Sequence, residues 1–291
     1  MPVARNNSRN TGFSLVELMV GMVLGLILIA GAVSIYLASK RSYVEVEQVA
    51  ALTENARFAE RIIGDSLRHV GFLGEVPADR VESDLAPPPG DCATPSEAGA
   101  YGSPDLFPLV FAASVDSFDC IDDGKAGTDA LVIKHVLPRP ISDNPRDSGS
   151  GGDSSPGNGV IDSLQDGRVY VMTSNVGGLL FDGAAPPTIT TGGEFPDGTA
   201  WEYQYEIFYI RQPQPTDVPR LARRVLSYNP TTSAMEFVTE DLAEGVEELH
   251  LLFGYDDNGD GEVDTYTDVA TIEDENWSDE WLNVESLEVF M

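Results

Sequence analysis

The sequence is poor in the residues that most often build catalytic and metal centres. Its 291 residues include only two cysteines and three histidines, and His69, His135 and His250 lie far apart from one another. It has no His-Glu-x-x-His zinc motif, no phosphate-binding loop and no dinucleotide fingerprint. We therefore expect a protein that is not an enzyme, in which the histidines are isolated core or surface residues.

Basic residues are also scarce. The chain has 17 Lys and Arg against 48 Asp and Glu, which gives a formal net charge of -31, and only Lys40, Lys125 and Lys134 are lysines. Such a charge repels nucleic acid and anionic lipid head groups, so we expect no nucleic-acid partner. Salt screens the self-repulsion of a chain like this one, which suggests a salty habitat.

The chain begins with a polar leader that contains Arg5 and Arg9, and an apolar run follows from Phe13 to Leu37. As a helix this run is roughly 37 Å long, against about 30 Å for the apolar core of a bilayer. Its one charged side chain is Glu17. A carboxylate at mid-membrane costs on the order of 2.5 to 3.5 kcal/mol, so Glu17 is expected to have a polar partner.

Gly12, Phe13 and Glu17, with the basic leader before them, resemble the start of type IV prepilins and pseudopilins. The resemblance implies that a prepilin peptidase removes the leader, residues 1–12, and methylates the new amine of Phe13. It also implies that Glu17 pairs with the Phe13 amine of a neighbouring subunit, where carboxylate and ammonium offset each other's desolvation cost. Residues 13–37 would then cross the inner membrane once and later form the filament core, with the globular domain in the periplasm and finally in the extracellular pilus.

Two other interpretations of this stretch stay open. Ala30-Gly31-Ala32 has the small residues of an ordinary secretory cleavage site, which would release a soluble protein that starts at Val33. The run is also long enough to be a plain membrane anchor without an assembly role. Charge counting does not decide the orientation, because Arg5 and Arg9 are matched by Lys40 and Arg41 after the run.

Helical periodicity continues beyond the apolar run. Apolar residues recur mostly at three- and four-residue steps up to Val70, and Gly71, Gly74 and Pro77 end the pattern. The sequence therefore predicts one helix over residues 13–70, whose second half lies against a globular domain, residues 71–291. Several parts of the chain resemble PilW minor pilins, namely the stretches at 54–59, 67–72 and 244–249 and the terminal strand. For the first two stretches, the alternative is an amphipathic helix that matches by chance.

The globular part contains β-rich runs separated by turn signals. The runs that predict strands cover residues 130–136, 168–173, 201–211, 221–227, 235–239, 246–253 and 284–290. The strongest, 201–211, places five residues on one face, namely Trp201, Tyr203, Tyr205, Ile207 and Tyr209. We therefore predict an α+β fold in which the long helix packs on an antiparallel β-sheet. A mobile loop is predicted at residues 138–159, which have little to bury.

Cys92 and Cys120 lie on the side of the membrane that the resemblance places in the periplasm, where disulfides persist. A bond between them would close a loop of about 28 residues and contribute about 3 to 4 kcal/mol in the chain-entropy model. Free buried thiols and metal ligation are the alternatives, although no neighbouring Cys or His completes a zinc site.

The acidic loop, residues 256–264, fits the first half of an EF-hand calcium loop. Asp256, Asn258 and Asp260 alternate, Gly261 permits the sharp turn, and Asp264 reaches the ion directly or through water. The twelfth position departs from the pattern because it is Thr267 rather than Glu. Calcium is the one cofactor that the sequence suggests, and a polar β-turn without a cation is the alternative.

The resemblance to PilW implies a minor pilin that helps prime assembly of a type IV pilus and sits near its tip. Its partners would be other minor pilins, the major pilin and a tip adhesin, besides the prepilin peptidase. A pseudopilin of a type II secretion system would have the same fold. A secreted calcium-binding or hydrolytic protein is the alternative from another class.

Overall fold

The computed structural model describes residues 12–102, 108–141, 161, 164–189, 192–273 and 283–291. The chain forms two compact units, one up to Thr53 and one from Glu54 onward. A single helix, α1 (Leu15–Leu67), runs from the first unit into the second. It covers most of the predicted range 13–70. The predicted mobile loop at 138–159 lies largely outside the described residues.

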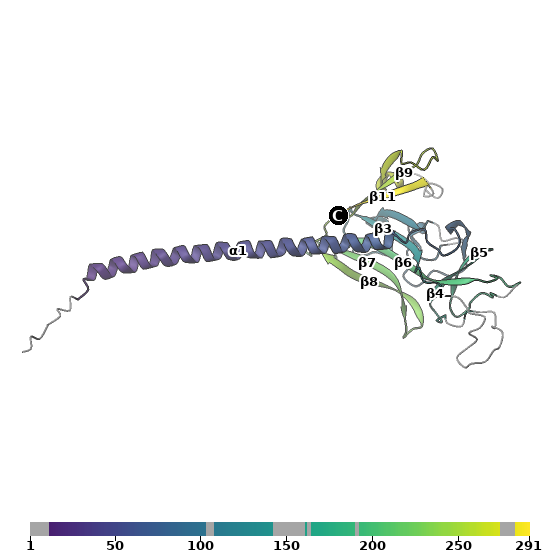
Figure 1. Ribbon diagram of the computed structural model, residues 1–291, viewed down its shortest axis with the longest axis horizontal. Coiled ribbons are helices and arrows are strands. Elements are labelled where there is room, and N and C mark those ends of the chain that lie inside the picture. Colours follow the sequence, from purple (N-terminus) through teal and green to yellow (C-terminus); the bar gives the residue numbers. More distant parts are fainter. Residues whose placement is uncertain (1–11, 103–107, 142–160, 162–163, 190–191, 274–282) are drawn as a thin grey trace, which may run out of the picture. The chain divides into compact units, whose positions relative to one another are not determined.

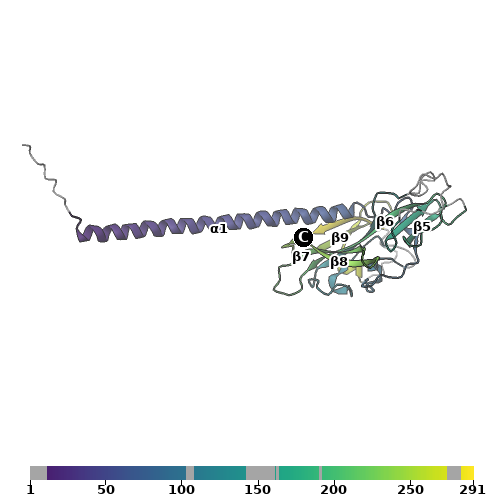
Figure 2. The same cartoon turned by 90° about the horizontal axis from the view of Figure 1, so that it is seen from below.

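The first unit contains the apolar part of α1. The apolar side chains from Phe13 to Leu37 are exposed. Figures 1 and 2 show that the helix continues without a break. Among the described residues, α1 is long and apolar enough to cross a membrane. The exposed apolar surface therefore agrees with a segment whose natural surroundings are lipid or other helices.

The second unit is mostly β-structure. Its strands are β1 (Val81–Ser83), β2 (Val110–Ser114), β3 (Asp129–Val136), β4 (Val169–Ser174), β5 (Gly177–Asp182), β6 (Thr199–Arg211), β7 (Arg220–Asn229), β8 (Ala234–Glu244), β9 (His250–Tyr255), β10 (Thr265–Asp268) and β11 (Val284–Phe290). Its described helices, besides the end of α1, are α2 (Val269–Glu273) and three 3₁₀ turns at Ala78–Arg80, Ser96–Ala98 and Val115–Ser117. The α+β class predicted from the sequence is confirmed.

β6 is the strand on which the larger sheet is built. It is 13 residues long and pairs antiparallel with β4 near its start, with β3 in its middle and with β7 near its end. The described order is β1-β5-β4-β6-β3-β2, with β7 pairing both β6 and β8. Among the described strands, only β1 and β5 pair in parallel. A glycine is needed at Gly178, because a Cβ there would lie 2.8 Å from the Val81 side chain of β1.

A second, smaller sheet corrects the expectation of a single one. Its order is β10-β9-β11, all antiparallel, and it holds the predicted strands at 246–253 and 284–290. Asp129 lies at the start of β3. Its backbone N–H donates to the Leu249 carbonyl, and its side-chain Oδ2 accepts the backbone N–H of Leu251. These two bonds attach the small sheet to the large one, beside β3 in Figure 1.

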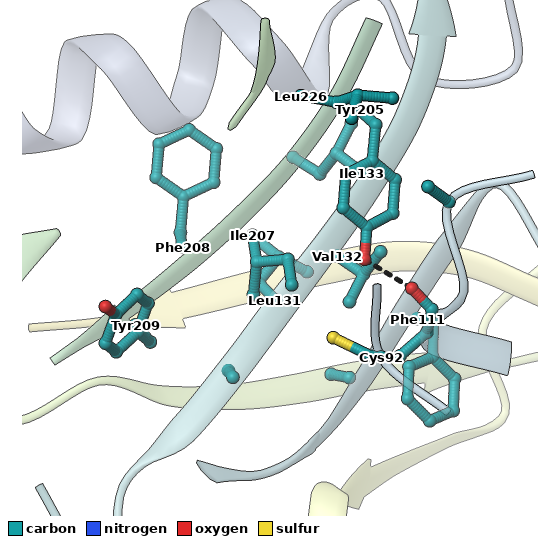
Figure 3. Packing of buried hydrophobic residues seen from close by; sticks show 14 of the residues in the cluster. Cys92, Phe111, Leu131, Val132, Ile133, Tyr205, Ile207, Phe208, Tyr209 and Leu226 are labelled. Atoms are coloured by element: carbon teal, nitrogen blue, oxygen red, sulfur yellow. Dashed lines mark hydrogen bonds between the residues drawn. The ribbon is translucent and has the colours of Figure 1, made fainter. Parts of the chain in front are cut away.

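Both faces of β6 are buried. The face predicted from the sequence is covered by the segment around Cys92, and Figure 3 shows Tyr205 of this face near Cys92. The hydroxyls of Tyr203 and Tyr205 donate to the carbonyls of Ala100 and Ala98 in that segment. The opposite face, with Glu206 and Phe208, is buried as well. It lies under the last turns of α1, whose Ala59, Ile63 and Ser66 are its buried residues. The core is therefore two layers, one on each side of the strand.

Candidate functional site

The start of α1 brings together the residues predicted for processing and assembly. Gly12 and Phe13 precede the helix and are exposed, Phe13 to 83%. The Ser14 backbone N–H donates to Glu17 Oε2 at 3.1 Å, and the Glu17 backbone N–H donates to Ser14 Oγ at 3.4 Å. This reciprocal pair is a capping box, which satisfies two N–H groups that the first helical turn leaves without partners.

In the capping box, the Glu17 carboxylate has a hydrogen-bond partner within its own chain. Its carboxylate is exposed and held by a backbone N–H, so a stronger donor, such as an ammonium, is able to replace that contact. From the sequence, Glu17 was predicted only as a partner for another subunit, and the role of Ser14 was not predicted. The Ser-x-x-Glu spacing that reveals it is readable in the sequence.

The disulfide is present. Cys92 and Cys120 are bonded, with their Cα atoms 4.9 Å apart, which confirms the prediction over free thiols and metal ligation. The bond fixes the segment that supplies the carbonyls of Ala98 and Ala100 to the two buried tyrosines. Its role in the structure is thus to hold one covering layer of the core in place.

The acidic loop folds around Asp256. This side chain is only 4% exposed, and its carboxylate accepts backbone N–H bonds from Asn258 at 3.0 Å, Gly259 at 2.7 Å and Gly261 at 2.7 Å. The Gly261 bond, followed by those of Gly259 and Asn258, holds the pKa of Asp256 below its usual value. The position that the calcium pattern assigns to the first ligand is therefore filled by the loop's own amides.

The other predicted calcium ligands also face donors of the loop. Asp264 Oδ2 accepts from the Asp257 backbone N–H at 3.1 Å and from Asn258 Nδ2 at 2.9 Å, and Asp260 Oδ1 accepts from the Glu262 backbone N–H at 2.9 Å. In the part of the chain that the structure describes, no group of three or more His, Cys, Asp or Glu could hold a metal ion. Calcium binding by this loop stays a prediction.

We expect millimolar calcium to raise the melting temperature of the protein, and Asp260→Ala to abolish that shift. A ligand present at a hundredfold excess over its Kd stabilises the folded state by about 2.7 kcal/mol. Asp256→Ala is the informative companion, because it should lower the melting temperature even without calcium by leaving three loop amides without their acceptor. Calorimetry that detects no calcium heat and no shift would leave the loop as an amide-satisfied turn.

The histidines are not all isolated, which corrects the sequence analysis. The rings of His69 and His135 stack with centroids 5.6 Å apart, although 66 positions separate them in the chain. Burial, and then the nearby His69, lowers the pKa of His135 to about 4. His250 is half exposed and its Nδ1 lies 3.6 Å from a carboxylate oxygen of Asp129. At neutral pH, His135 is therefore an uncharged core residue.

Two comparisons agree with these observations. Residues 207–291 match the family described as type IV pilus-assembly protein W, PilW, and residues 7–33 match the prokaryotic N-terminal methylation motif. No curated protein and no solved structure matches the chain. The resemblance stated from the sequence is confirmed in these two regions, which contain Gly12, Phe13 and Glu17 at one end and the stretch 244–249 with the terminal strand at the other. That the protein is not an enzyme stays a prediction.

Proposed function

We propose that the protein is a minor pilin that helps prime assembly of a type IV pilus and sits near its tip. The observation that carries this proposal is the exposed turn at Gly12, Phe13 and Glu17, placed at the start of a 53-residue helix and inside the matched methylation motif. A prepilin peptidase would cut after Gly12, and residues 13–37 would hold the subunit in the inner membrane until it enters the pilus.

Assembly would use the carboxylate of Glu17. In the separate chain this group accepts the Ser14 backbone N–H, and in the filament it would accept the methylated ammonium of Phe13 from a neighbouring subunit. Close approach of the two helices is supported by the Gly-x-x-x-Gly spacing of Gly21 and Gly25, which carry no side chain on the exposed apolar part of α1. The neighbours would be other minor pilins and the major pilin, with a tip adhesin beyond them.

The experiment that tests processing is the intact mass of the mature chain. We expect an N-methylated chain that starts at Phe13, and we expect Gly12→Val to accumulate the unprocessed chain, because the peptidase needs a small residue before the cut. A mature chain that starts at Val33 would contradict the proposal. The two starting points exclude each other, so one spectrum decides between them.

The experiment that tests assembly compares three variants, each supplied as the sole copy. Glu17→Ala should be processed and membrane-bound but recovered in sheared pili at a small fraction of the wild-type level. Ser14→Ala removes the cap and keeps the carboxylate, and Glu47→Ala removes another exposed acid of α1, so both should be incorporated normally. Equal recovery of all four proteins would show that Glu17 has no role in assembly.

A further inference from the structure

The turn that follows α1, residues 68–74, attaches the end of the helix to the larger sheet. The Phe72 carbonyl accepts the Val136 backbone N–H of β3 at 3.1 Å, and the Phe72 ring lies edge-on against Trp201 of β6, with ring centroids 5.3 Å apart. Gly74 has a φ of +95°, and a Cβ there would overlap the indole ring of Trp201. The turn therefore lies directly on the sheet, and we call this contact the α1–sheet junction.

Two imidazole rings stack across the α1–sheet junction. The rings of His69 in the turn and His135 on β3 have centroids 5.6 Å apart and planes 20° apart. His135 is only 5% exposed, and its Nδ1 is buried without a hydrogen-bond partner among the described residues. In an imidazolium both ring nitrogens are donors, so protonation would make this Nδ1 a charged, buried donor without an acceptor.

The carboxylates on this face of the sheet are already paired. His135 lies opposite Gln204 of β6, and two residues to either side of Gln204 are Glu202 and Glu206, each of which binds an arginine. The other charged side chains nearest to the junction are Asp65, Arg68 and Glu75, which are exposed, and Lys134, which lies on the opposite face of β3. A charge on His135 would therefore meet no unpaired carboxylate of the described residues on this sheet face.

These surroundings make the junction sensitive to acid. Burial, and then the nearby His69, lower the pKa of His135 to about 4. In an opened junction the ring would have the ordinary pKa of about 6.5. The closed junction therefore has its full stability above about pH 6.5 and loses it as the pH falls towards 4, because the open form binds the proton in preference.

We propose that the α1–sheet junction is an acid-sensitive latch, which opens when His135 takes up a proton and releases the end of α1 from β3. The latch uses neither Glu17 nor cleavage after Gly12, so the failure of its test would leave the proposed function unchanged. If the proposed function holds, the globular domain lies outside the cytoplasm, where the pH of the surroundings acts on the latch directly.

Hydrogen–deuterium exchange of the full-length chain in neutral detergent micelles tests the latch. The reporter is the Val136 amide, which donates to Phe72 across the junction, and the reference is the Lys125 amide, which donates to the Ile210 carbonyl near the other end of β6. Between pH 7 and pH 5 the protection factor of Val136 should fall about twentyfold, as pKa values of about 4 and 6.5 require. That of Lys125 should stay nearly constant.

Two variants remove the titrating group. His135→Phe keeps a buried ring that binds no proton, so the protection of Val136 should become independent of pH between 7 and 5. His135→Gln is uncharged as well and serves if the first variant does not fold, which the melting temperature at pH 7 decides. Asp91, whose pKa is raised by burial, lies in the segment that covers the opposite face and is kept in both variants.

The matched control is His250→Gln, which removes the half-exposed histidine beside Asp129 and should keep the wild-type fall in protection. The inference is overturned if Val136 in the wild type is equally protected at both pH values, or if the fall persists in the folded His135 variant. It is also overturned if Lys125 loses protection in parallel with Val136, since acid would then loosen the whole sheet and not the junction.

Discussion

Replacing Glu206 with alanine should lower the free energy of unfolding of the globular unit by about 3 kcal/mol. Glu206 is 6% exposed on β6, where Oε2 accepts from Ser66 Oγ of α1 at 2.5 Å and Oε1 accepts from Arg223 Nη1 of β7 at 2.8 Å. Removal of one member of a buried ion pair typically costs about 3 to 5 kcal/mol. The lower end applies because Arg223 keeps Glu240 as a second partner.

The matched control is Glu240→Ala. Glu240 binds the same guanidinium, with Oε2 at 2.6 Å from Nη2, but its side chain is 45% exposed. Exposed pairs contribute about 0 to 1 kcal/mol, so this variant should be nearly as stable as the wild type. Guanidinium denaturation followed by far-ultraviolet circular dichroism gives both values. Equal losses in the two variants would mean that Glu206 does not join α1 to the sheet.

The position of Glu206 shows where sequence reasoning stops. Alternation along 201–211 identified the aromatic face of β6 and the length of the strand, because both depend on local pattern. It gave no assignment for the other face. That face is buried because α1, about 140 residues earlier in the chain, covers it with Ser66 opposite Glu206. The apolar stripe of the helix predicted that it packs on the sheet, but at that sequence separation neither segment alone shows which strand face or which residues meet.

The missed strands have a similar explanation. β2 and β5 contain the small residues Ala112, Ala113, Gly177 and Gly178, which lower their apparent β-propensity. Their small size is what the packing needs, since Gly178 accommodates the Val81 side chain of β1. The low β-propensity of these residues disfavours a strand, whereas the small space available requires small side chains. Packing determines that both segments form strands.

The candidate site divides in the same way. Gly12, Phe13 and Glu17 could be identified from the sequence because the signal is a contiguous motif, and Ser14 could have been added from its three-residue spacing to Glu17. The stacking of His69 on His135 could not, because it depends on how the turn after α1 meets β3. The acidic loop could be predicted only in part. Its composition suggested a bound cation, whereas in the folded loop backbone amides bind the carboxylate of Asp256.

Loss of the disulfide should lower the free energy of unfolding by roughly 3 to 4 kcal/mol. Cys92 and Cys120 close a loop with a sequence separation of 28, and in the chain-entropy model the unfolded chain gains conformational entropy worth this much when the loop is opened. The loop also covers the aromatic face of β6. In Cys92→Ser, Cys120→Ser, the carbonyls of Ala98 and Ala100 should hold the hydroxyls of Tyr205 and Tyr203 less firmly.

Tyr205→Phe separates the two contributions. It removes the hydrogen bond to Ala98 and keeps the disulfide, so it should cost about 1 kcal/mol, the usual net value of one hydrogen bond. Denaturation of the wild type with and without a reductant should reproduce the loss seen in the double serine variant. If that variant loses no more stability than Tyr205→Phe, the covering layer is held by packing on β6, and the disulfide adds nothing to the stability of the fold.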